Sequence, residues 1–548
     1  MSDRVLVCVA WPYANYLLHV GQAAGAYLPA DIFARYQRLA GHDVLMVSGS
    51  DCHGTPITLA AEREGTTPQE IVDLYHPKIL EVWERFGISF DIFTWTLTEN
   101  HYETTQEVFT RLLEQDYLYT NTQDQLFDPE AGRFLPDRYV EGTCPRCGYG
   151  EARGDQCDSC GSQLDAIDLI DPRSKFSGAT PEVRPTKQFF LKLTAFEEGL
   201  RDWVSAKKHW RRNVLNSTLG MLGEGLKDRA ITRDLEWGVP VPVDGHDDKR
   251  IYVWFDAVIG YLSSTREWAQ RQEDPEAWRP WWEDPETRAY YFIGKDNIVF
   301  HTVIWPAMLQ GYGGLNLPYD VPANQYVNFS AGQKQSKSKG TGNWMLDLLD
   351  QYDPDVIRFY LTSVMPETSD SEFREDELIR ANNDVLISTW GNLANRVLSM
   401  INRNFDGVVP EAGALSPESE ALLAETKDAF AALGHEYEAC HFRSALQEGL
   451  KLAQSANKYL DGRAPWKAVK SNKIHAAETL ATALNVINSL KILLRPVLPF
   501  STEKLHEYLS LGQSVDELSW AYAPVPAGTQ LAKPQPLYTK LEVEAVTK

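Results

Sequence analysis

A buried strand that runs straight into a polar turn is the feature that most restricts the fold of this chain. Five consecutive apolar residues, 5–9, precede the stretch AWPYANYLLHVGQ, which carries Pro12, Asn15, His19 and Gly21. This order is typical of a parallel strand that leads into the N-terminus of a helix. Crevices of this kind bind phosphates. The stretch therefore predicts an α/β sheet protein with a nucleotide site near its N-terminus.

Apolar periodicity divides the chain into five segments. Residues 1–115 alternate short β-branched runs with helical patterns, which predicts the first half of a Rossmann-like doubly wound parallel sheet. Turn-rich sequence over 116–230 predicts an inserted connective domain with a zinc knuckle, and 231–325 predicts the second half of the sheet. Residues 326–375 are expected to form a linking domain with a lysine loop. The long amphipathic patterns over 376–548 predict an all-helical bundle.

Composition and charge narrow the function classes. A length of 548 residues predicts roughly three or four domains. The net charge of −23 argues against nonspecific coating of nucleic acid. A basic run at 207–212 (KKHWRR) leaves selective RNA binding open, although it also fits a solvated helix face. Neither a membrane-spanning run nor a signal-peptide pattern occurs, so we expect a cytoplasmic protein without membrane contact.

Four of the seven cysteines form a cluster with the spacing C-x2-C-x9-C-x2-C, namely Cys144, Cys147, Cys157 and Cys160. Each pair can fold into a tight knuckle with both thiolates on one side, and two knuckles complete a tetrahedral sulfur site that suits zinc. Four thiolates leave no position for water, so one structural Zn²⁺ is expected. Redox-active pairs and chance are the alternative interpretations.

A lysine-rich loop is the candidate partner of the His19 turn, because the chain has neither a Walker A loop nor a dinucleotide fingerprint. In GQKQSKSKGTG, residues 332–342, Lys334 and Lys337 lie three residues apart between glycines. Two ammonium groups so placed can stabilise charge that grows on the β and γ phosphates of ATP as they leave. Alone, such a loop is usually only solvated; together with the His19 turn it favours an ATP site.

A series of motifs covers nearly the whole chain. VAWPYAN followed by HVGQ, SGSDCHGTPI, the four-cysteine knuckle, YVWFDAVIGY, FIGKDNIVFH, KQSKS and APW occur in this order. In these motifs and their intervals the chain resembles the methionyl-tRNA synthetases, which are class I aminoacyl-tRNA synthetases. The resemblance implies that methionine attacks the α-phosphorus of ATP, bound with Mg²⁺, to give methionyl-adenylate and pyrophosphate. The terminal ribose of a tRNA with a CAU anticodon then takes the methionyl group.

The resemblance also implies roles for individual residues. The expected catalytic residues are His19, Gln22, Lys334 and Lys337. The expected ATP-binding residues are Pro12, Asn15, His19, Gly21, Gln22, Gly294, Asp296, Lys334 and Lys337. The expected methionine-binding residues are Trp11, Tyr13, Asp51, Trp254, Ala257, Tyr261 and His301. The expected anticodon readers are Asn392, Arg396 and Trp466.

The chemistry of these side chains fits the implied roles. Asp51, at the end of the second strand run, supplies an anion for the ammonium group of an amino acid, although it could equally cap a helix. Aromatic side chains form the polarizable apolar pocket that a thioether needs, and their alternative is ordinary core. Asp296 could likewise be only a helix cap. Asn392 and Arg396 share a helix face and can contact unstacked bases, or they form a plain polar surface.

Three positions depart from the family pattern. Gln22 replaces a second His, Tyr16 stands where Gly is usual, and Gln335 fills a position that is usually apolar. Loss of a preorganised donor costs about 3 to 4 kcal/mol in the transition state. Because Gln22 keeps an amide donor, we expect slowed rather than abolished activation. Tyr16 crowds the nucleotide, or strains the backbone, or points outward without effect.

Three function classes remain open at this point. The first is a methionine–tRNA ligase, the second is a paralogue that uses another apolar amino acid or another acceptor, and the third is a non-catalytic tRNA-binding relative. Asp51, Lys334 and Lys337 argue against the third class, because a binder does not need activation residues. The chain ends after the helical bundle without an appended nucleic-acid-binding domain, from which we expect a monomer.

Overall fold

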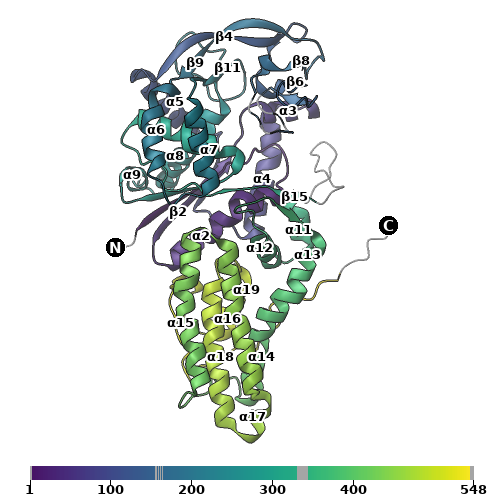
Figure 1. Ribbon diagram of the computed structural model, residues 1–548, viewed down its shortest axis with the longest axis vertical. Coiled ribbons are helices and arrows are strands. Elements are labelled where there is room, and N and C mark those ends of the chain that lie inside the picture. Colours follow the sequence, from purple (N-terminus) through teal and green to yellow (C-terminus); the bar gives the residue numbers. More distant parts are fainter. Residues whose placement is uncertain are drawn as a thin grey trace.

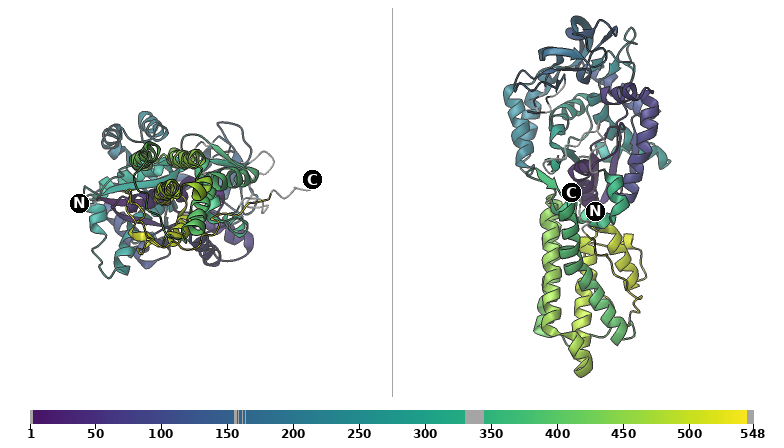
Figure 2. Two further views of the ribbon diagram at one scale, coloured as in Figure 1. Left: turned by 90° about the horizontal axis from the view of Figure 1, so that it is seen from below. Right: turned by 90° about the vertical axis from the view of Figure 1, so that its right-hand side faces the viewer.

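The computed structural model describes residues 3–542, except 155, 156, 158, 161, 163 and 330–343. The described chain is elongated, with a sheet-containing half at one end from which a bundle of long helices extends (Figure 1; Figure 2, right). None of the helices within these ranges is long and apolar enough to cross a membrane.

Five parallel strands form the central sheet, in the order β14-β13-β1-β2-β3. They are β1 (Arg4–Val9), β2 (Asp43–Ser50), β3 (Ile92–Trp95), β13 (Arg288–Gly294) and β14 (Ala323–Asn324). β1 and β13 are almost wholly buried, as expected for a parallel sheet covered on both faces. The chain first adds β2 and β3 on one side of β1 and later β13 and β14 on the other. A topological switch point, the usual ligand site of such sheets, therefore lies between β1 and β13.

Helices cover both faces of this sheet. α2 and α8 both pack against β2, and α8 lies above the strands of Figure 1 while α2 lies below them. The helices of this part are α1 (Val20–Gln22), η1 (Ala23–Tyr27), α2 (Leu28–Leu39), α3 (Thr55–Glu64), α4 (Pro68–Phe86), α5 (Glu99–Glu114), α8 (Val253–Arg271), α9 (Arg279–Glu283), η5 (Lys295–Asn297), η6 (Phe300–Ile304) and α10 (Trp305–Tyr312). Thr67 and Thr98 fix the starts of α4 and α5, because each accepts the backbone N–H three residues further on.

The segment between α5 and α8 contains two larger sheets, at the end of the molecule opposite the bundle (Figure 1), and a short pair of strands, β11-β12. The larger sheet, β10-β9-β4-β5, consists of β4 (Leu118–Asp128), β5 (Arg133–Phe134), β9 (Glu182–Leu191) and β10 (Arg229–Ala230). The smaller, β7-β6-β8, consists of β6 (Val140–Thr143), β7 (Ala152–Arg153) and β8 (Ile170–Ser174). The remaining elements are η2 (Asp137–Tyr139), η3 (Ala166–Asp168), η4 (Leu193–Phe196), α6 (Glu197–Ser205), α7 (Arg212–Glu224), β11 (Thr232–Arg233) and β12 (Arg250–Ile251). The smaller sheet has its own hydrophobic core, which includes Cys144 and Cys157.

Two cations of the basic run at 207–212 bond to other parts of the protein. Lys207 Nζ donates to the carbonyl of Pro318 at 2.9 Å, and Arg211 donates to Asn324 Oδ1 at 2.6 Å and to the carbonyl of Cys440 at 2.8 Å. These bonds attach the inserted segment to the edge of the parallel sheet and to the helical bundle.

A linking unit and the helical bundle complete the chain. In the linking unit β15 (Val327–Phe329) pairs in parallel with β16 (Ser371–Phe373), and α11 (Met345–Gln351) and α12 (Pro354–Ser363) lie between them in sequence. The bundle part contains α13 (Glu375–Arg380), η8 (Ala381–Gly391), α14 (Asn392–Asn404), α15 (Pro417–Glu438), α16 (Phe442–Arg463), α17 (Pro465–Ser471), α18 (Lys473–Leu494), α19 (Pro499–Leu509) and η9 (Val515–Glu517). This architecture confirms the predicted fold class, a Rossmann-like doubly wound sheet with an insertion and a C-terminal helical bundle.

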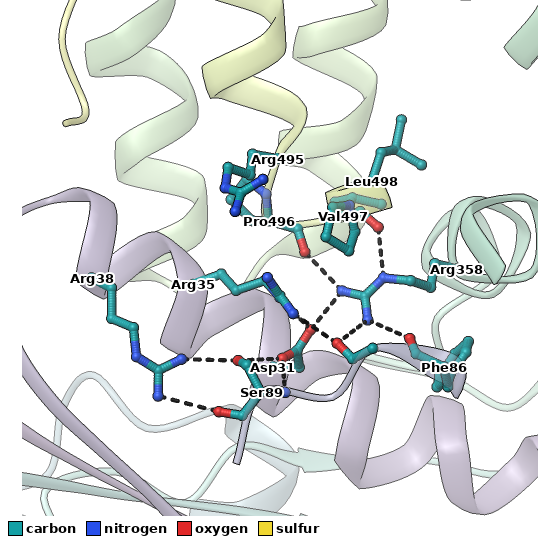
Figure 3. Close-up of polar contacts among 12 residues, drawn as sticks. Asp31, Arg35, Arg38, Phe86, Ser89, Arg358, Arg495, Pro496, Val497 and Leu498 are labelled. Carbon is teal, nitrogen blue, oxygen red and sulfur yellow. Dashed lines mark hydrogen bonds and ion pairs between the residues drawn. The ribbon is translucent and has the colours of Figure 1, made fainter. Parts of the chain in front are cut away.

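A buried arginine joins the parallel sheet, the linking unit and the bundle (Figure 3). Arg358 of α12 has no exposed surface and donates to Asp31 Oδ2 of α2 at 2.6 Å. It also donates to the carbonyls of Pro496 and Val497, at 2.9 and 2.8 Å, in the connection between α18 and α19. Arg358 belongs to the linking unit, whereas Asp31 belongs to the sheet part and Pro496 and Val497 belong to the bundle. The arginine therefore fixes the three units to one another.

Candidate functional site

The turn after β1 is held against the end of β2 by backbone hydrogen bonds. Ala14 N–H donates to the carbonyl of Asp51 at 2.9 Å, and Asp51 N–H donates to the carbonyl of Pro12 at 2.8 Å. On the other side, Ala10 N–H donates to the carbonyl of Phe292 in β13 at 3.0 Å. The turn therefore spans the carboxyl edge of the sheet at the switch point.

His19 and Gln22 bond to each other across the first turn of α1. The backbone N–H of Gln22 donates to His19 Nδ1 at 3.3 Å, and the backbone N–H of His19 donates to Gln22 Oε1 at 3.1 Å. This reciprocal pair is a capping box. A Cβ at Gly21 would lie 3.0 Å from the His19 ring, so glycine leaves the room that the ring occupies.

The Tyr16 side chain packs in an aromatic cluster. Its ring lies 5.7 Å from that of Tyr75 in a stacked arrangement and 5.0 Å from that of Trp344. Tyr16 is not among the described residues with a positive φ, so this position does not demand glycine. Of the possibilities open for Tyr16, backbone strain is thus excluded.

Trp344 brings the C-terminal flank of the lysine loop to His19. It forms an isolated antiparallel bridge with His19, and the next residue, Met345, donates its N–H to the carbonyl of Leu18 at 2.9 Å. On the N-terminal flank, the carbonyl of Val327 lies 3.6 Å from the Cβ position of Gly21. The expected catalytic Lys334 and Lys337, and Gln335 between them, lie outside the described residues.

The other expected nucleotide-binding residues lie at the same edge of the sheet. Asn15 Nδ2 donates to the carbonyl of Pro56 at 3.2 Å, whereas its buried Oδ1 has no partner within the described chain. Gly294 ends β13, and Asp296 follows it in η5 and accepts a hydrogen bond from the Tyr326 hydroxyl. A Cβ at Gly294 would meet nothing within 4 Å, so the chain leaves space there.

Asp51 is a buried carboxylate at the end of β2. It is 2% exposed and accepts the backbone N–H of His53 at 3.1 Å. Burial and the nearby charge of Asp256 raise the pKa of the Asp51 carboxyl well above its usual range, against the effect of the His53 bond. No Lys, Arg or His side chain of the described ranges pairs with Asp51. Such a carboxylate is complementary to an ammonium ligand.

Several aromatic rings pack together on the turn after β1, α8 and η6, and Tyr13 forms an isolated β-bridge with Asp51. Trp254 of α8 stacks on Phe300 of η6 with ring centroids 4.3 Å apart, and Tyr13 meets Trp254 edge-on at 6.2 Å. Trp11 lies between Gly49 and Gly260, whose Cβ positions would come within 2.4 and 2.7 Å of its ring. Both glycines are therefore required for the position of Trp11.

A buried tyrosine–histidine pair joins α8 to η6. The Tyr261 hydroxyl bonds to His301 Nε2 at 2.8 Å, and His301 Nδ1 lies 2.8 Å from the carbonyl of Asn297. Because only a protonated Nδ1 can bond to a carbonyl, Nε2 accepts from the tyrosine. Burial lowers the pKa of His301 to about 4, which keeps the ring neutral. Ala257, one turn before Tyr261, is also buried.

Sequence reasoning missed several residues that pack against these side chains. Phe300, Gly49 and Gly260 lie within quoted motifs, but their roles depend on contacts with rings far away in the sequence. His53 and Asp256 lie within the motifs SGSDCHGTPI and YVWFDAVIGY, and their buried bond at 2.6 Å appears only in three dimensions.

The four clustered cysteines fit a zinc ion. Cys144 Sγ lies 3.9 Å from Cys160 Sγ, and Cys147 Sγ lies 3.6 Å from Cys157 Sγ. All four sulfurs lie within 4.8 Å of one another. Zn–S bonds of about 2.3 Å place tetrahedral sulfurs about 3.8 Å apart. The donor set and its spacing therefore suit a closed, structural Zn²⁺ site.

The three expected anticodon readers lie in the helical bundle. Asn392 and Arg396 are on α14, and Trp466 is on α17, at the tip of the bundle in Figure 1. Arg396 lies 5.2 Å from the centre of the Trp466 ring and pairs with Asp461 at 3.0 Å. Trp466 is 40% exposed, so a base can stack on it.

Comparisons with known proteins match one family over nearly the whole chain. A family model described as tRNA synthetases class I (M) matches residues 5–398, and one described as the anticodon binding domain of methionyl tRNA ligase matches 409–548. A methionine–tRNA ligase of Roseiflexus castenholzii is 50% identical over 99% of this chain and 97% of its own. One of Dehalococcoides mccartyi (strain CBDB1) is 52% identical over 100% and 98%.

Solved structures agree as well. The crystal structure of Mycobacterium tuberculosis methionyl-tRNA synthetase bound by methionyl-adenylate superposes with a TM-score of 0.81 and 25% identity, covering 98% of this chain and 100% of that one. The sheet, the His19 turn and the bundle define a class I aminoacyl-tRNA synthetase. Within that class the chain belongs to the methionyl-tRNA synthetase family, as its motifs predict.

Proposed function

We propose that this protein is a methionine–tRNA ligase, which activates methionine with ATP and transfers it to tRNA with a CAU anticodon. The observation that carries the proposal is Asp51, a buried carboxylate that pairs with no cation in the described chain and lies beside the His19 turn. It supplies the charge that binds a free α-ammonium group. Full-length relatives named methionine–tRNA ligase support the same activity.

In this proposal the pocket around Asp51 selects methionine. Trp11, Tyr13, Trp254 and Ala257 present apolar surface to the thioether, whose polarizable sulfur favours aromatic contacts. Tyr261 and neutral His301 use their polar atoms on each other and on Asn297. The pocket thus offers the side chain few free donors, which disfavours amino acids with polar ends.

The adjacent turn is proposed to hold ATP and its Mg²⁺. Pro12, Asn15, Gly21, Gly294 and Asp296 line the edge of the sheet where the nucleotide would lie. His19, Gln22, Lys334 and Lys337 would stabilise charge on the phosphates as the methionine carboxylate attacks the α-phosphorus and pyrophosphate leaves. Val327 lies beside Gly21 and Trp344 lies beside His19, so both flanks of the lysine loop meet this turn, which supports the pairing.

The remaining proposals concern zinc, tRNA and assembly. Cys144, Cys147, Cys157 and Cys160 would hold one Zn²⁺ that stabilises the smaller inserted sheet. Asn392, Arg396 and Trp466 would read the anticodon at the bundle tip. We also propose that the protein acts as a cytoplasmic monomer, which sedimentation of the purified protein and fractionation of source cells would test.

Pyrophosphate exchange with a panel of amino acids tests the proposal, followed by charging of CAU tRNA. Exchange that depends on methionine, together with charging, is the expected result. Exchange with another apolar amino acid, or exchange without charging, would identify a paralogue of different specificity. Absence of any exchange, with tRNA binding retained, would identify a non-catalytic relative.

A further inference from the structure

Three buried ionisable side chains next to the pocket have no part in the reaction proposed above. Asp256 is 0% exposed, and His53 and His101 are each 1% exposed. They come from three elements: His53 from the loop after β2, His101 from α5 and Asp256 from the first turn of α8. Groups of this kind are costly to bury, so their partners must compensate for the lost hydration.

The distances identify a hydrogen-bonded cluster rather than a metal site. His53 Nδ1 lies 2.6 Å from Asp256 Oδ2, and His101 Nε2 lies 2.5 Å from Asp256 Oδ1. Bonds of about 2.0 to 2.1 Å to a tetrahedral zinc would hold ligand atoms roughly 3.3 Å apart. These pairs are much closer, so both histidines donate directly to the carboxylate.

The outer nitrogens of both rings also have partners. His53 Nε2 lies 3.2 Å from the Tyr102 hydroxyl, and His101 Nδ1 lies 2.8 Å from Ser263 Oγ. Burial opposes ionisation of Asp256, but the two histidines outweigh it and lower the pKa of this carboxyl well below its usual range. Asp256 is therefore a fixed anion that holds two rings in defined orientations.

Each member of the cluster is connected to a wall of the methionine pocket. The backbone N–H of His53 donates to Asp51 Oδ1 at 3.1 Å. The His101 ring lies 6.2 Å from that of Trp11. Asp256 precedes Ala257 and lies four residues before Gly260, against which the Trp11 ring packs.

We propose that Asp256, through His53 and His101, is a positioning residue that sets the geometry of the amino-acid pocket. By tying the loop after β2 and α5 to the start of α8, it fixes Asp51 relative to the aromatic wall. The inference rests on the proposed function, since it concerns affinity for methionine. It assigns the cluster no contact with ATP, which binds at the turn after β1.

Asp256→Asn tests this inference, because the amide keeps the size of the side chain but cannot accept from both histidines. We expect KM for methionine in pyrophosphate exchange to rise by about tenfold or more, while KM for ATP stays within about twofold. The matched control is Glu478→Gln, which makes the same chemical change in a buried carboxylate of the bundle that is bound by Ser416 and Ser419. In the control, both KM values should stay at the wild-type level even if the melting temperature falls.

A second pair of variants applies if Asp256→Asn does not fold. In His101→Gln the Nε2 amide can still donate to Asp256, whereas in His101→Leu no donor remains. We expect KM for methionine to rise more in His101→Leu than in His101→Gln, with KM for ATP unchanged in both.

Two results would overturn the inference. One is an unchanged KM for methionine in Asp256→Asn and His101→Leu; the other is a loss of activity that leaves both KM values alone and parallels the loss of folded protein. Methionine-dependent exchange by the wild-type protein is measured in the same series. If it is absent, the proposed function itself fails; if it is present, the variants judge the positioning role alone.

Discussion

The backbone N–H of His19 donates to Gln22 Oε1 at 3.1 Å, and the backbone N–H of Gln22 donates to His19 Nδ1 at 3.3 Å. Gln22 thus orients the ring that the proposed mechanism places on the phosphates. Its Oε1 accepts from the backbone of His19, which leaves the Nε2 amide as the donor that the proposed mechanism uses on the phosphates.

We predict that Gln22→Ala slows methionine-dependent pyrophosphate exchange by about a hundredfold, since a lost preorganised donor costs on this order. The bond to Gln22 Oε1 is lost at the same time, whereas the backbone bond to His19 Nδ1 stays, so the melting temperature should fall slightly. Gln22→His, which supplies a ring donor, should raise kcat above wild type. Equal kcat for all three proteins would show that position 22 has no part in activation.

Tyr16 gives a second prediction, because it packs on Trp344 at the end of the lysine loop. Removing the ring in Tyr16→Gly should lower stability by about 1 to 2 kcal/mol, from the lost aromatic contacts and the added backbone freedom. KM for ATP should rise several-fold. Tyr16→Phe keeps the ring and is the control, expected to match wild type; an unchanged melting temperature in Tyr16→Gly would contradict the packing role.

The raised pKa of Asp51 predicts how methionine binding depends on pH. Burial and Asp256 favour the protonated acid in the empty pocket, but only the carboxylate pairs with an ammonium group. Binding must therefore release a proton below the raised pKa, and affinity falls as the pH falls. KM for methionine should increase by up to about tenfold per pH unit in that range, while KM for ATP does not follow it. In Asp51→Asn the pH dependence should vanish along with most of the affinity.

The cysteine cluster predicts a local rather than global response to zinc removal. Purified protein should contain one zinc per chain by elemental analysis. Because the smaller sheet has its own core, chelation should expose backbone amides near Cys144 and Cys157 to hydrogen exchange and leave those of β1 and β13 protected. Cys157→Ser should behave like the chelated protein. Collapse of protection across the parallel sheet would show that the metal supports the whole fold.

The predictions that the structure confirms were based on patterns within short stretches of sequence. The apolar run of β1 reflects burial on both faces of the sheet, and the cysteine spacing reflects a shared metal site. Both requirements act between residues that are close in sequence, so both can be recognised from the sequence. The bond between Gln22 and His19 also has a local signature, the three-residue spacing of a capping box, with histidine in place of the usual Ser or Thr.

Long-range contacts account for what could not be predicted. Trp11 is held by Gly49 and Gly260, and Trp254 stacks on Phe300, which it meets only because α8 and η6 converge. The sequence around each of these residues does not indicate which distant residue it will contact. The roles assigned to Lys334 and Lys337 stay predictions, because both residues lie outside the described chain.

The buried pair of Arg358 and Asp31 has a consequence for substrate choice. Breaking it would leave a charge without water, at a cost of about 3 to 5 kcal/mol, so thermal motion seldom opens the junction between the sheet and the bundle. The proposed methionine site and Trp466, at the end of the bundle, are then held at a fixed distance from each other. In the proposed function, a tRNA with the right bases but a different distance from anticodon to acceptor end could contact one of these two sites, but not both together.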